Sequence, residues 1–207
     1  MIEFFFDCSS PWTWLAFHNI QPLARELGVT IRWRPVLVGG IFNAVNPSVY
    51  EFRERGVKAK QDYLKKDLQD WARQAQLTLK FPPTVFPVNS VKAMRGCLVL
   101  DAEGKLVPFA TAVFEAYWSR DEDISQDPVL AGLCERIGVE PRRFFEGIGR
   151  PEVKAQLKAN TDEAIVRGAF GSPTIFVDGD DMYFGNDRLG LVRDAVLRRQ
   201  RAATSKA

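Results

Sequence analysis

Strand-like patterns stand near the two ends of this 207-residue chain, and mainly helical patterns lie between them. Near the N-terminus, Ile2 to Phe6 is an apolar run typical of a strand buried on both faces. Apolar residues at helical spacing follow from Pro11, with Gly28 placed as a C-terminal cap. The alternation that begins at Val29 then predicts a strand over 29–38. This order indicates a parallel pair of strands with a right-handed crossover.

The C-terminal end of the chain returns to strands. Thr174 to Val177 and Met182 to Phe184 are short apolar runs, and the DGDD sequence between them favours a hairpin. Asn186 or Asp187 is placed to cap a last amphipathic helix. The chain therefore reads as βαβ followed later by ββα, which is the thioredoxin arrangement when both parts share one sheet.

The residues between these two parts, about a hundred of them, are predicted to be helical. Gly39 and Gly40 end the second strand pattern, and Asp127 is placed as an N-cap before Pro128. A loop rich in proline interrupts the helices at Phe81–Asn89. We expect an α/β fold with a discontinuous thioredoxin-like domain at 1–45 and 162–207 and an all-helical insertion domain at 46–161.

Composition excludes several classes of function. Hydrophobic residues make up 46% and charged residues 26% of the chain, as in ordinary soluble proteins, and no apolar run is long enough to span a membrane. The net charge of +2 is too small for a typical nucleic-acid-binding protein. The first residues lack the basic region of an export signal, which predicts a cytoplasmic protein. Three separated cysteines and the single His18 predict free thiols and no metal site.

Ser10 and Pro11 stand where the first strand ends and the first helix begins. The backbone N–H groups at a helix N-terminus are unpaired, and the helix dipole favours negative charge there. Serine is a good cap, and proline fits the first helical position because no N–H is needed there. Ser10 is therefore either a structural cap or a hydroxyl that donates to a bound anion.

The stretch FFFDCSSPWTWLAF resembles the N-terminal motif FDxxSPxSxLA of the kappa-class glutathione transferases and the related 2-hydroxychromene-2-carboxylate isomerases. These families belong to the DsbA-like branch of the thioredoxin superfamily. Five further pieces match in the family's order and cover nearly the whole chain: RPVLVGGIFNAVNP, DYLKKDL, FPVNSVKAMRG, GAFGSPTIFVDG and FGNDRL. The segment FPVNS…AMRG and the compact length favour the isomerase branch. The resemblance also implies a homodimer.

The resemblance implies that the reactive thiol belongs to glutathione. Ser10-Pro11-Trp12-Thr13 occupies the place of a CxxC motif with hydroxyls instead of sulfurs, which argues against a disulfide oxidoreductase. A charge-assisted hydrogen bond from Ser10 would contribute about 1.5–3 kcal/mol and the helix dipole up to about 1 kcal/mol. Together they would largely ionise a thiol whose pKa starts near about 8.5.

The resemblance also implies the residues that bind glutathione and a small aromatic carboxylate. Glutathione is expected at Ser10, at the cis-proline pair Ser172 and Pro173, at Asn186 and Asp187 for its γ-glutamyl end, and at Asn46 and Lys60 for its glycyl end. The aromatic acid is expected at Trp12, Phe42, Lys60 and Asn89. Each also has a structural interpretation, since caps, exposed lysines and core aromatics are common.

Two other residues compete with Ser10 for a chemical role. Cys8 lies at the strand end, where a free cysteine is more often buried and inert than reactive. His18 lies off the core face of its helix, and a lone histidine is more often structural than catalytic. We expect neither to be catalytic.

The predicted activity is a glutathione-dependent isomerase that acts during aromatic-compound catabolism, with the thiolate adding to a double bond and then leaving. A kappa-like transferase or peroxidase would use the same thiolate with a different outcome. A non-catalytic module that binds a peptide along Ser172 and Pro173 is a third alternative.

Overall fold

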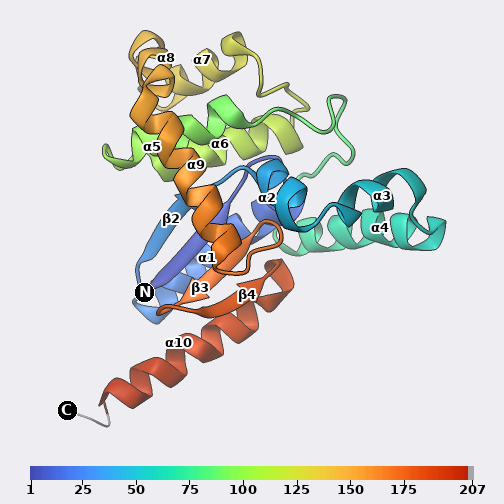
Figure 1. The fold of residues 1–207 in the computed structure, drawn as a ribbon, viewed down its shortest axis with the longest axis vertical. Helices are drawn as coiled ribbons and strands as arrows, with labels where there is room; N and C mark the ends of the chain where they lie inside the picture. Colours follow the sequence, from blue (N-terminus) through green and yellow to red (C-terminus); the bar gives the residue numbers. More distant parts are fainter. Residues whose placement is uncertain (205–207) are drawn as a thin grey trace.

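The computed structural model describes residues 1–204, without the side chain of Arg53. Its centre is a four-stranded sheet in the order β2-β1-β3-β4 (Figure 1). β1 (Ile2–Phe6) pairs in parallel with β2 (Ile31–Pro35) and antiparallel with β3 (Thr174–Val177). The hairpin to β4 (Asp181–Phe184) follows. The two ends of the chain thus share one sheet, which confirms the predicted thioredoxin-like fold.

Alternate residues of β1 face two different layers. Phe4 and Phe6 join the main core, which also holds the inner faces of α1 (Pro11–Leu27) and α10 (Leu189–Thr204). Phe5 packs on the opposite side with Phe176 and with Ala164 of α9 (Pro151–Val166). Because both faces are covered, every residue of β1 is buried, as its unbroken apolar run predicts.

The helical insertion forms two groups (Figure 1). One group packs together beside the sheet and consists of α5 (Val91–Asp101), α6 (Leu106–Trp118), α7 (Asp127–Arg136) and α8 (Pro141–Gly149). The other is an arm that projects sideways and consists of α3 (Ser48–Arg55) and α4 (Lys58–Gln74). The domain division at 46–161 stays a prediction, and its second boundary falls within α9.

Four local predictions are corrected. The strand predicted over 29–38 is shorter, because β2 covers only Ile31–Pro35. A short helix, α2 (Val38–Val45), follows it and contains Gly39 and Gly40, and the carboxylate of Asp7 accepts the Val38 N–H in its first turn. Asp127 is the first residue of α7 rather than its cap. The residues Asn186–Arg188 form a 3₁₀ turn, η1, that precedes α10. In the described chain no helix is long and apolar enough to cross a membrane.

Candidate active site

Ser10 caps α1 at the C-terminal end of β1. Its backbone is extended (φ −109°, ψ 124°), its Oγ accepts the Thr13 N–H at 3.2 Å, and Pro11 takes the first helical position. The single hydroxyl hydrogen of Ser10 is donated to the backbone carbonyl of Ser172 at 3.1 Å. The capping hydrogen bond and the proline at the first helical position are therefore both present. The Ser10 hydroxyl also contacts the C-terminal part of the fold through Ser172.

Ser172 precedes a cis peptide bond to Pro173, as the resemblance implies. Its Oγ lies 2.7 Å from the Thr13 Oγ1 and accepts the backbone N–H of Asp7 at 3.1 Å. Thr13 and Ser172 are both buried. Sequence analysis placed Thr13 at the second cysteine position of the missing CxxC motif but did not predict its contact with Ser172.

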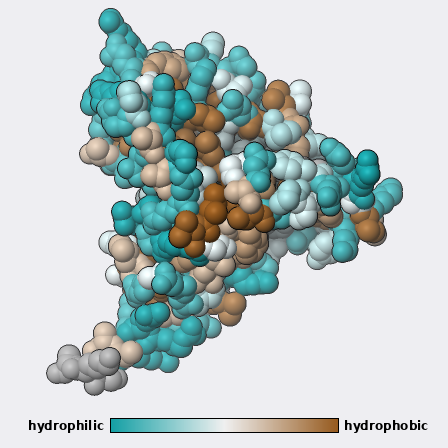
Figure 2. Space-filling view, in the orientation of Figure 1, coloured by the Kyte–Doolittle hydropathy of each residue, from teal (hydrophilic) through white to brown (hydrophobic). Residues whose placement is uncertain are grey.

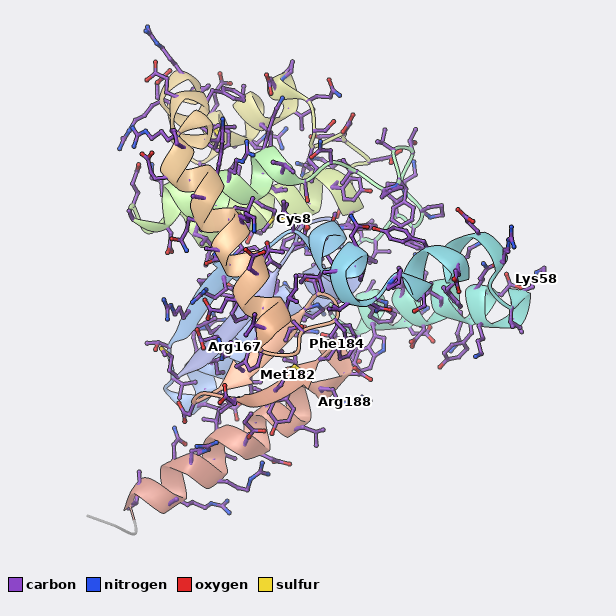
Figure 3. All side chains as sticks on the ribbon, viewed as in Figure 1. Cys8, Lys58, Arg167, Met182, Phe184 and Arg188 are labelled. Carbon is purple, nitrogen blue, oxygen red and sulfur yellow. The ribbon has the colours of Figure 1, made fainter. Side chains whose placement is uncertain are left out.

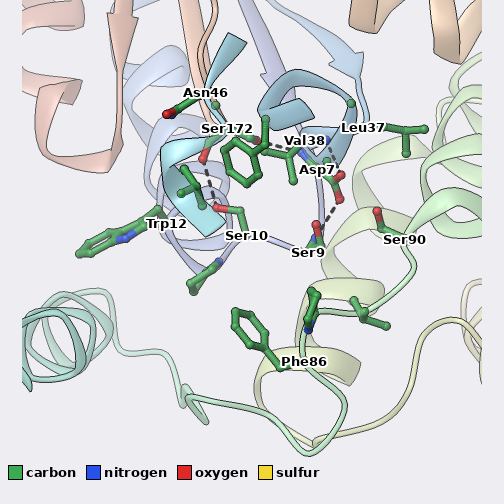
Figure 4. A pocket seen from close by; sticks show the side chains of 18 of the residues that line it. Asp7, Ser9, Ser10, Trp12, Leu37, Val38, Asn46, Phe86, Ser90 and Ser172 are labelled. Atoms are coloured by element: carbon green, nitrogen blue, oxygen red, sulfur yellow. Dashed lines mark hydrogen bonds between the residues drawn. The ribbon is translucent and has the colours of Figure 1, made fainter. Parts of the chain in front are cut away.

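Asp7 is a buried carboxyl beside Ser10 that sequence analysis missed (Figure 4). It accepts the Ser9 N–H at 2.9 Å, the Val38 N–H at 2.8 Å and a hydrogen bond from the Ser90 side chain. Burial raises the pKa of Asp7, although these hydrogen bonds act to lower it. The sequence feature that could have identified Asp7 is its position as a charged residue directly after a buried apolar strand.

Cys8 does not face the site. Its side chain is fully buried, and its backbone N–H lies 3.3 Å from the Met94 sulfur. Burial, together with the neighbouring Cys97 and Asp7, raises the pKa of the Cys8 thiol well above its ordinary value. The interpretation of Cys8 as an inert packing residue is thus supported, and His18 is exposed on the outer face of α1.

A cavity of about 650 Å³ opens directly above Ser10 (Figure 4). The predicted residues Trp12, Phe42, Asn46 and Asn89 line it together with Ser10 and Ser172. Most of the remaining wall is apolar, and further aromatic side chains come from the arm, the proline-rich loop and the segments around β3 and β4: Tyr50, Phe52, Phe81, Phe86, Phe170 and Phe184. Hydrophobic residues also gather on the surface over this region (Figure 2).

The proline-rich loop forms one wall of the cavity and is anchored from outside. Asp121 forms an ion pair with Lys80 and accepts hydrogen bonds from the N–H and the hydroxyl of Thr84, each at 2.6 Å. These contacts, led by the Lys80 hydrogen bond, lower the pKa of Asp121 to about 2. The loop therefore holds Phe81 and Phe86 in the cavity wall through a charged clamp.

The remaining predicted residues lie outside this cavity. Lys60 is exposed in the first turn of α4, and the neighbouring Lys58 marks the outer end of the arm (Figure 3). Asn186 and Asp187 line a second, smaller depression of about 390 Å³ between α1, α4 and α10. Asn186 is buried and accepts the Asn19 side-chain N–H at 2.9 Å. Within the described chain the Nδ2 of Asn186 has no hydrogen-bond partner.

Asn186 is nevertheless close to the cis-proline. The N–H of Gly185 donates to the carbonyl of Pro173 at 3.3 Å, which ties the start of η1 to the segment that Ser10 contacts. Asn46 remains near the cavity, where its Nδ2 donates to the Phe170 carbonyl at 3.0 Å. The structure thus gathers most predicted residues around Ser10, whereas Asn186 and Asp187 line the second depression and Lys60 lies apart.

Comparisons with known proteins agree with this architecture. The family model of the DSBA-like thioredoxin domain matches residues 1–197. The chain belongs to this DsbA-like family.

More specific relatives are found within it. A 2-hydroxychromene-2-carboxylate isomerase from Pseudomonas putida is 32% identical over 96% of this chain and 95% of that protein. Glutathione S-transferase kappa 1 from Homo sapiens is 29% identical over 92% of this chain and 88% of that protein. A solved structure of 2-hydroxychromene-2-carboxylate isomerase superposes with a TM-score of 0.83 at 31% identity, covering 100% of this chain and 98% of that one. The chain is an enzyme of the isomerase-like group in this family.

Proposed function

We propose that the protein is a glutathione-dependent isomerase in which the thiolate of glutathione, bound at Ser10, is the nucleophile. The observation that carries the proposal is the position of the Ser10 hydroxyl, at the N-terminus of a 17-residue helix and at the floor of an apolar cavity. None of the described residues that line this cavity is a cysteine. The protein therefore supplies the stabilising donor, and the ligand supplies the sulfur.

Binding would redirect one hydrogen. The Ser10 hydroxyl now donates to the Ser172 carbonyl, and the same hydrogen would turn to the thiolate when glutathione binds. The released Ser172 carbonyl would then accept the backbone N–H of the cysteinyl residue, as in the addition of a strand. Binding would thus replace one internal hydrogen bond with two hydrogen bonds to glutathione.

The γ-glutamyl end has a route to Asn186. A short path connects Ser172 to Asn186. Ser172 is bonded covalently to Pro173, whose carbonyl accepts the Gly185 N–H, and Gly185 is bonded covalently to Asn186. A tripeptide spans about 10 Å when extended, which suits such a path. Asn186 begins η1, the turn before α10, and its unpartnered Nδ2 can donate to the carboxylate there. Roles for Asp187, Asn46 and Lys60 stay predictions.

The reaction requires no net proton. The thiolate adds to an activated carbon–carbon double bond, a carbon–sulfur bond forms, and the π electrons move to the conjugated carbonyl oxygen as an enolate. Rotation about the new single bond follows. The enolate then restores the double bond in the other configuration and expels the thiolate. The aromatic walls, including Trp12 and Phe42, hold the ring system during rotation.

The names of the relatives support an isomerase or a glutathione transferase. In a transferase the adduct would leave the enzyme instead of eliminating the thiolate. Assays with a strained cis enone and with an aryl halide separate the two outcomes. A catabolic role, a cytoplasmic location and a homodimer stay predictions.

The test is the ionisation of bound glutathione. Thiolate absorbance in the ultraviolet is followed against pH for the wild type, Ser10→Ala and Ser10→Thr. We expect the bound thiol to titrate roughly 1–2 units below free glutathione in the wild type, and to lose most of that shift in Ser10→Ala. Ser10→Thr keeps a hydroxyl and should keep most of the shift. An unshifted thiol in the wild type, or an unchanged shift in folded Ser10→Ala, contradicts the proposal.

A further inference from the structure

Two buried hydroxyl groups meet beside Ser10. The Oγ1 of Thr13, on α1, lies 2.7 Å from the Oγ of Ser172, which stands just before β3. This is a typical distance for a hydrogen bond between two hydroxyls. Both residues are buried. Because a buried hydroxyl without a partner is costly, the contact stabilises both side chains in these positions.

The side chain of Ser172 is also bonded to the end of β1. Its Oγ accepts the backbone N–H of Asp7 at 3.1 Å. The next residue, Pro173, has no N–H to donate, so the Ser172 side chain supplies polar contacts that the backbone cannot supply there. Through these two contacts the segment before β3 is tied to both α1 and β1.

Thr13 holds both of the groups that the proposed site uses. Its backbone N–H donates to the Ser10 Oγ at 3.2 Å, and its hydroxyl contacts Ser172. The carbonyl of Ser172 in turn accepts the Ser10 hydroxyl at 3.1 Å (Figure 4). These hydrogen bonds close a ring through Ser10, Thr13 and Ser172. Loss of the contact between Thr13 and Ser172 would open the ring and let the carbonyl shift relative to the Ser10 oxygen.

The position of the Ser172 carbonyl matters for binding glutathione. In the proposed function the Ser10 hydrogen turns from this carbonyl to the thiolate, and the carbonyl accepts the cysteinyl N–H instead. A carbonyl that moves toward Ser10 keeps the hydrogen, and one that moves away does not reach the N–H. The exchange therefore requires a carbonyl that is held in one place.

We propose that Thr13 and the side chain of Ser172 are positioning residues for glutathione. Their hydroxyl pair holds the Ser172 carbonyl where the Ser10 hydrogen can be exchanged for the cysteinyl N–H. This inference rests on the proposed function, because it places the thiolate at Ser10. Ser172 is among the described residues that line the cavity, and Thr13 is not. Thr13 therefore acts through Ser172.

The test measures the affinity for glutathione by calorimetry, which needs no second substrate. Thr13→Val removes one hydroxyl at nearly constant size, and Ser172→Ala removes the other. We expect each variant to bind glutathione at least about fivefold more weakly, as the loss of one hydrogen bond implies. Thr13→Ser keeps the hydroxyl and should bind glutathione as the wild type does. If Thr13→Val does not fold, Ser172→Ala carries the comparison.

Thr111→Val is the matched control. Thr111 lies on α6, donates to the Val107 carbonyl at 2.9 Å and is not among the described residues that line the cavity. We expect this variant to lose stability in thermal unfolding and to keep its affinity for glutathione. A purely structural role of Thr13 would give the same result for Thr13→Val, namely lower stability with a loss of affinity below fivefold, and this result overturns the inference.

The double variant Thr13→Val/Ser172→Ala tests whether the two hydroxyls act together. Because they share one hydrogen bond, we expect the double variant to bind glutathione no more than about twofold more weakly than the weaker-binding single variant. A larger additional loss in the folded double variant would show that the hydroxyls act independently, and it overturns the inference.

The two proposals fail in different experiments. An unshifted thiol pKa of glutathione bound to the wild type contradicts the proposed function. A shifted thiol pKa in the wild type, together with unchanged glutathione affinity in Thr13→Val and Ser172→Ala, contradicts only this inference.

Discussion

The side chains at and next to Ser10 have different roles, which follow from their chemistry. The Ser10 hydroxyl carries one transferable hydrogen, Cys8 is fully buried behind it, and Asp7 joins the end of β1 to the start of α2. Capping patterns placed Ser10 at the helix start, and the family resemblance implied its role beside a bound thiolate. They did not identify Asp7, because its partners Val38 and Ser90 are distant along the chain.

The first residue-scale prediction concerns Cys8. We expect Cys8→Ala to retain full isomerase activity and to lower the free energy of unfolding by about 1–2 kcal/mol, because a buried sulfur leaves a small cavity. Activity assays and chemical denaturation measure the two effects. A folded Cys8→Ala protein without activity, beside an active Ser10→Ala protein, would reverse the assignment of the site.

The second concerns Asp7 and pH. Because burial raises its pKa, the folded protein holds this proton more tightly than the unfolded chain does. The resulting stability is fully present below the ordinary value of 3.8 and is lost as the pH rises through the raised pKa. We expect the difference in unfolding free energy between the wild type and Asp7→Asn to shrink from about pH 4 toward neutrality.

Asp162→Asn, at an exposed ion pair on α9, is the control for Asp7→Asn and should show no such trend. A difference that grows with pH would mean that Asp7 stabilises the fold as a carboxylate through the Ser9 and Val38 amides.

At the scale of elements, the cavity depends on segments that have no regular pattern of their own. The loop at Phe81–Asn89 was correctly predicted to be neither helix nor strand, because proline cannot donate to a ladder. Its use as a cavity wall was not predictable from the sequence. The Asp121 clamp that holds it comes from the segment after α6, and no local rule connects the two.

We predict that Asp121→Ala raises the KM for the second substrate several-fold and leaves the pKa of bound glutathione unchanged. Loss of the clamp loosens Phe81 and Phe86 but does not touch Ser10. The lowered pKa of Asp121 contributes stability that is present above 3.8 and is lost as the pH falls through about 2, so assays at neutral pH see the intact clamp. Asp123→Ala is the control, because Asp123 bonds its own turn at Ser125 and Gln126. An unchanged KM would show that the Asp121 clamp does not position the loop that carries Phe81 and Phe86.

At the scale of the whole molecule, a charge network centred on the buried Glu3 joins α9 to the sheet. Glu3 of β1 contacts Arg34 of β2 at 3.4 Å and Arg167, directly after α9, at 2.9 Å. Glu163 of α9 pairs with both arginines. The guanidinium of Arg167 also lies 3.8 Å from the Phe176 ring centre. This network fixes α9 against the sheet.

We expect Glu3→Gln to lower the free energy of unfolding by up to about 3 kcal/mol, because both arginines lose a buried partner. Thermal and denaturant unfolding measure the loss. Asp162→Asn, which breaks an exposed pair on the same helix, should cause no measurable change. Equal effects of the two variants would show that the buried network adds nothing.

The sequence by itself determined the strands, the first helix with its Ser10 cap and Gly28 stop, and the absence of a dithiol at the helix start. These features depend on contacts within a few residues, which periodicity and capping chemistry report directly. Only the tertiary structure decided the burial of Asp7 and the aromatic cavity above Ser10. Those properties arise where the loop, the arm and the cis-proline segment meet, and side chains from distant positions acquire a common environment only after the chain has folded.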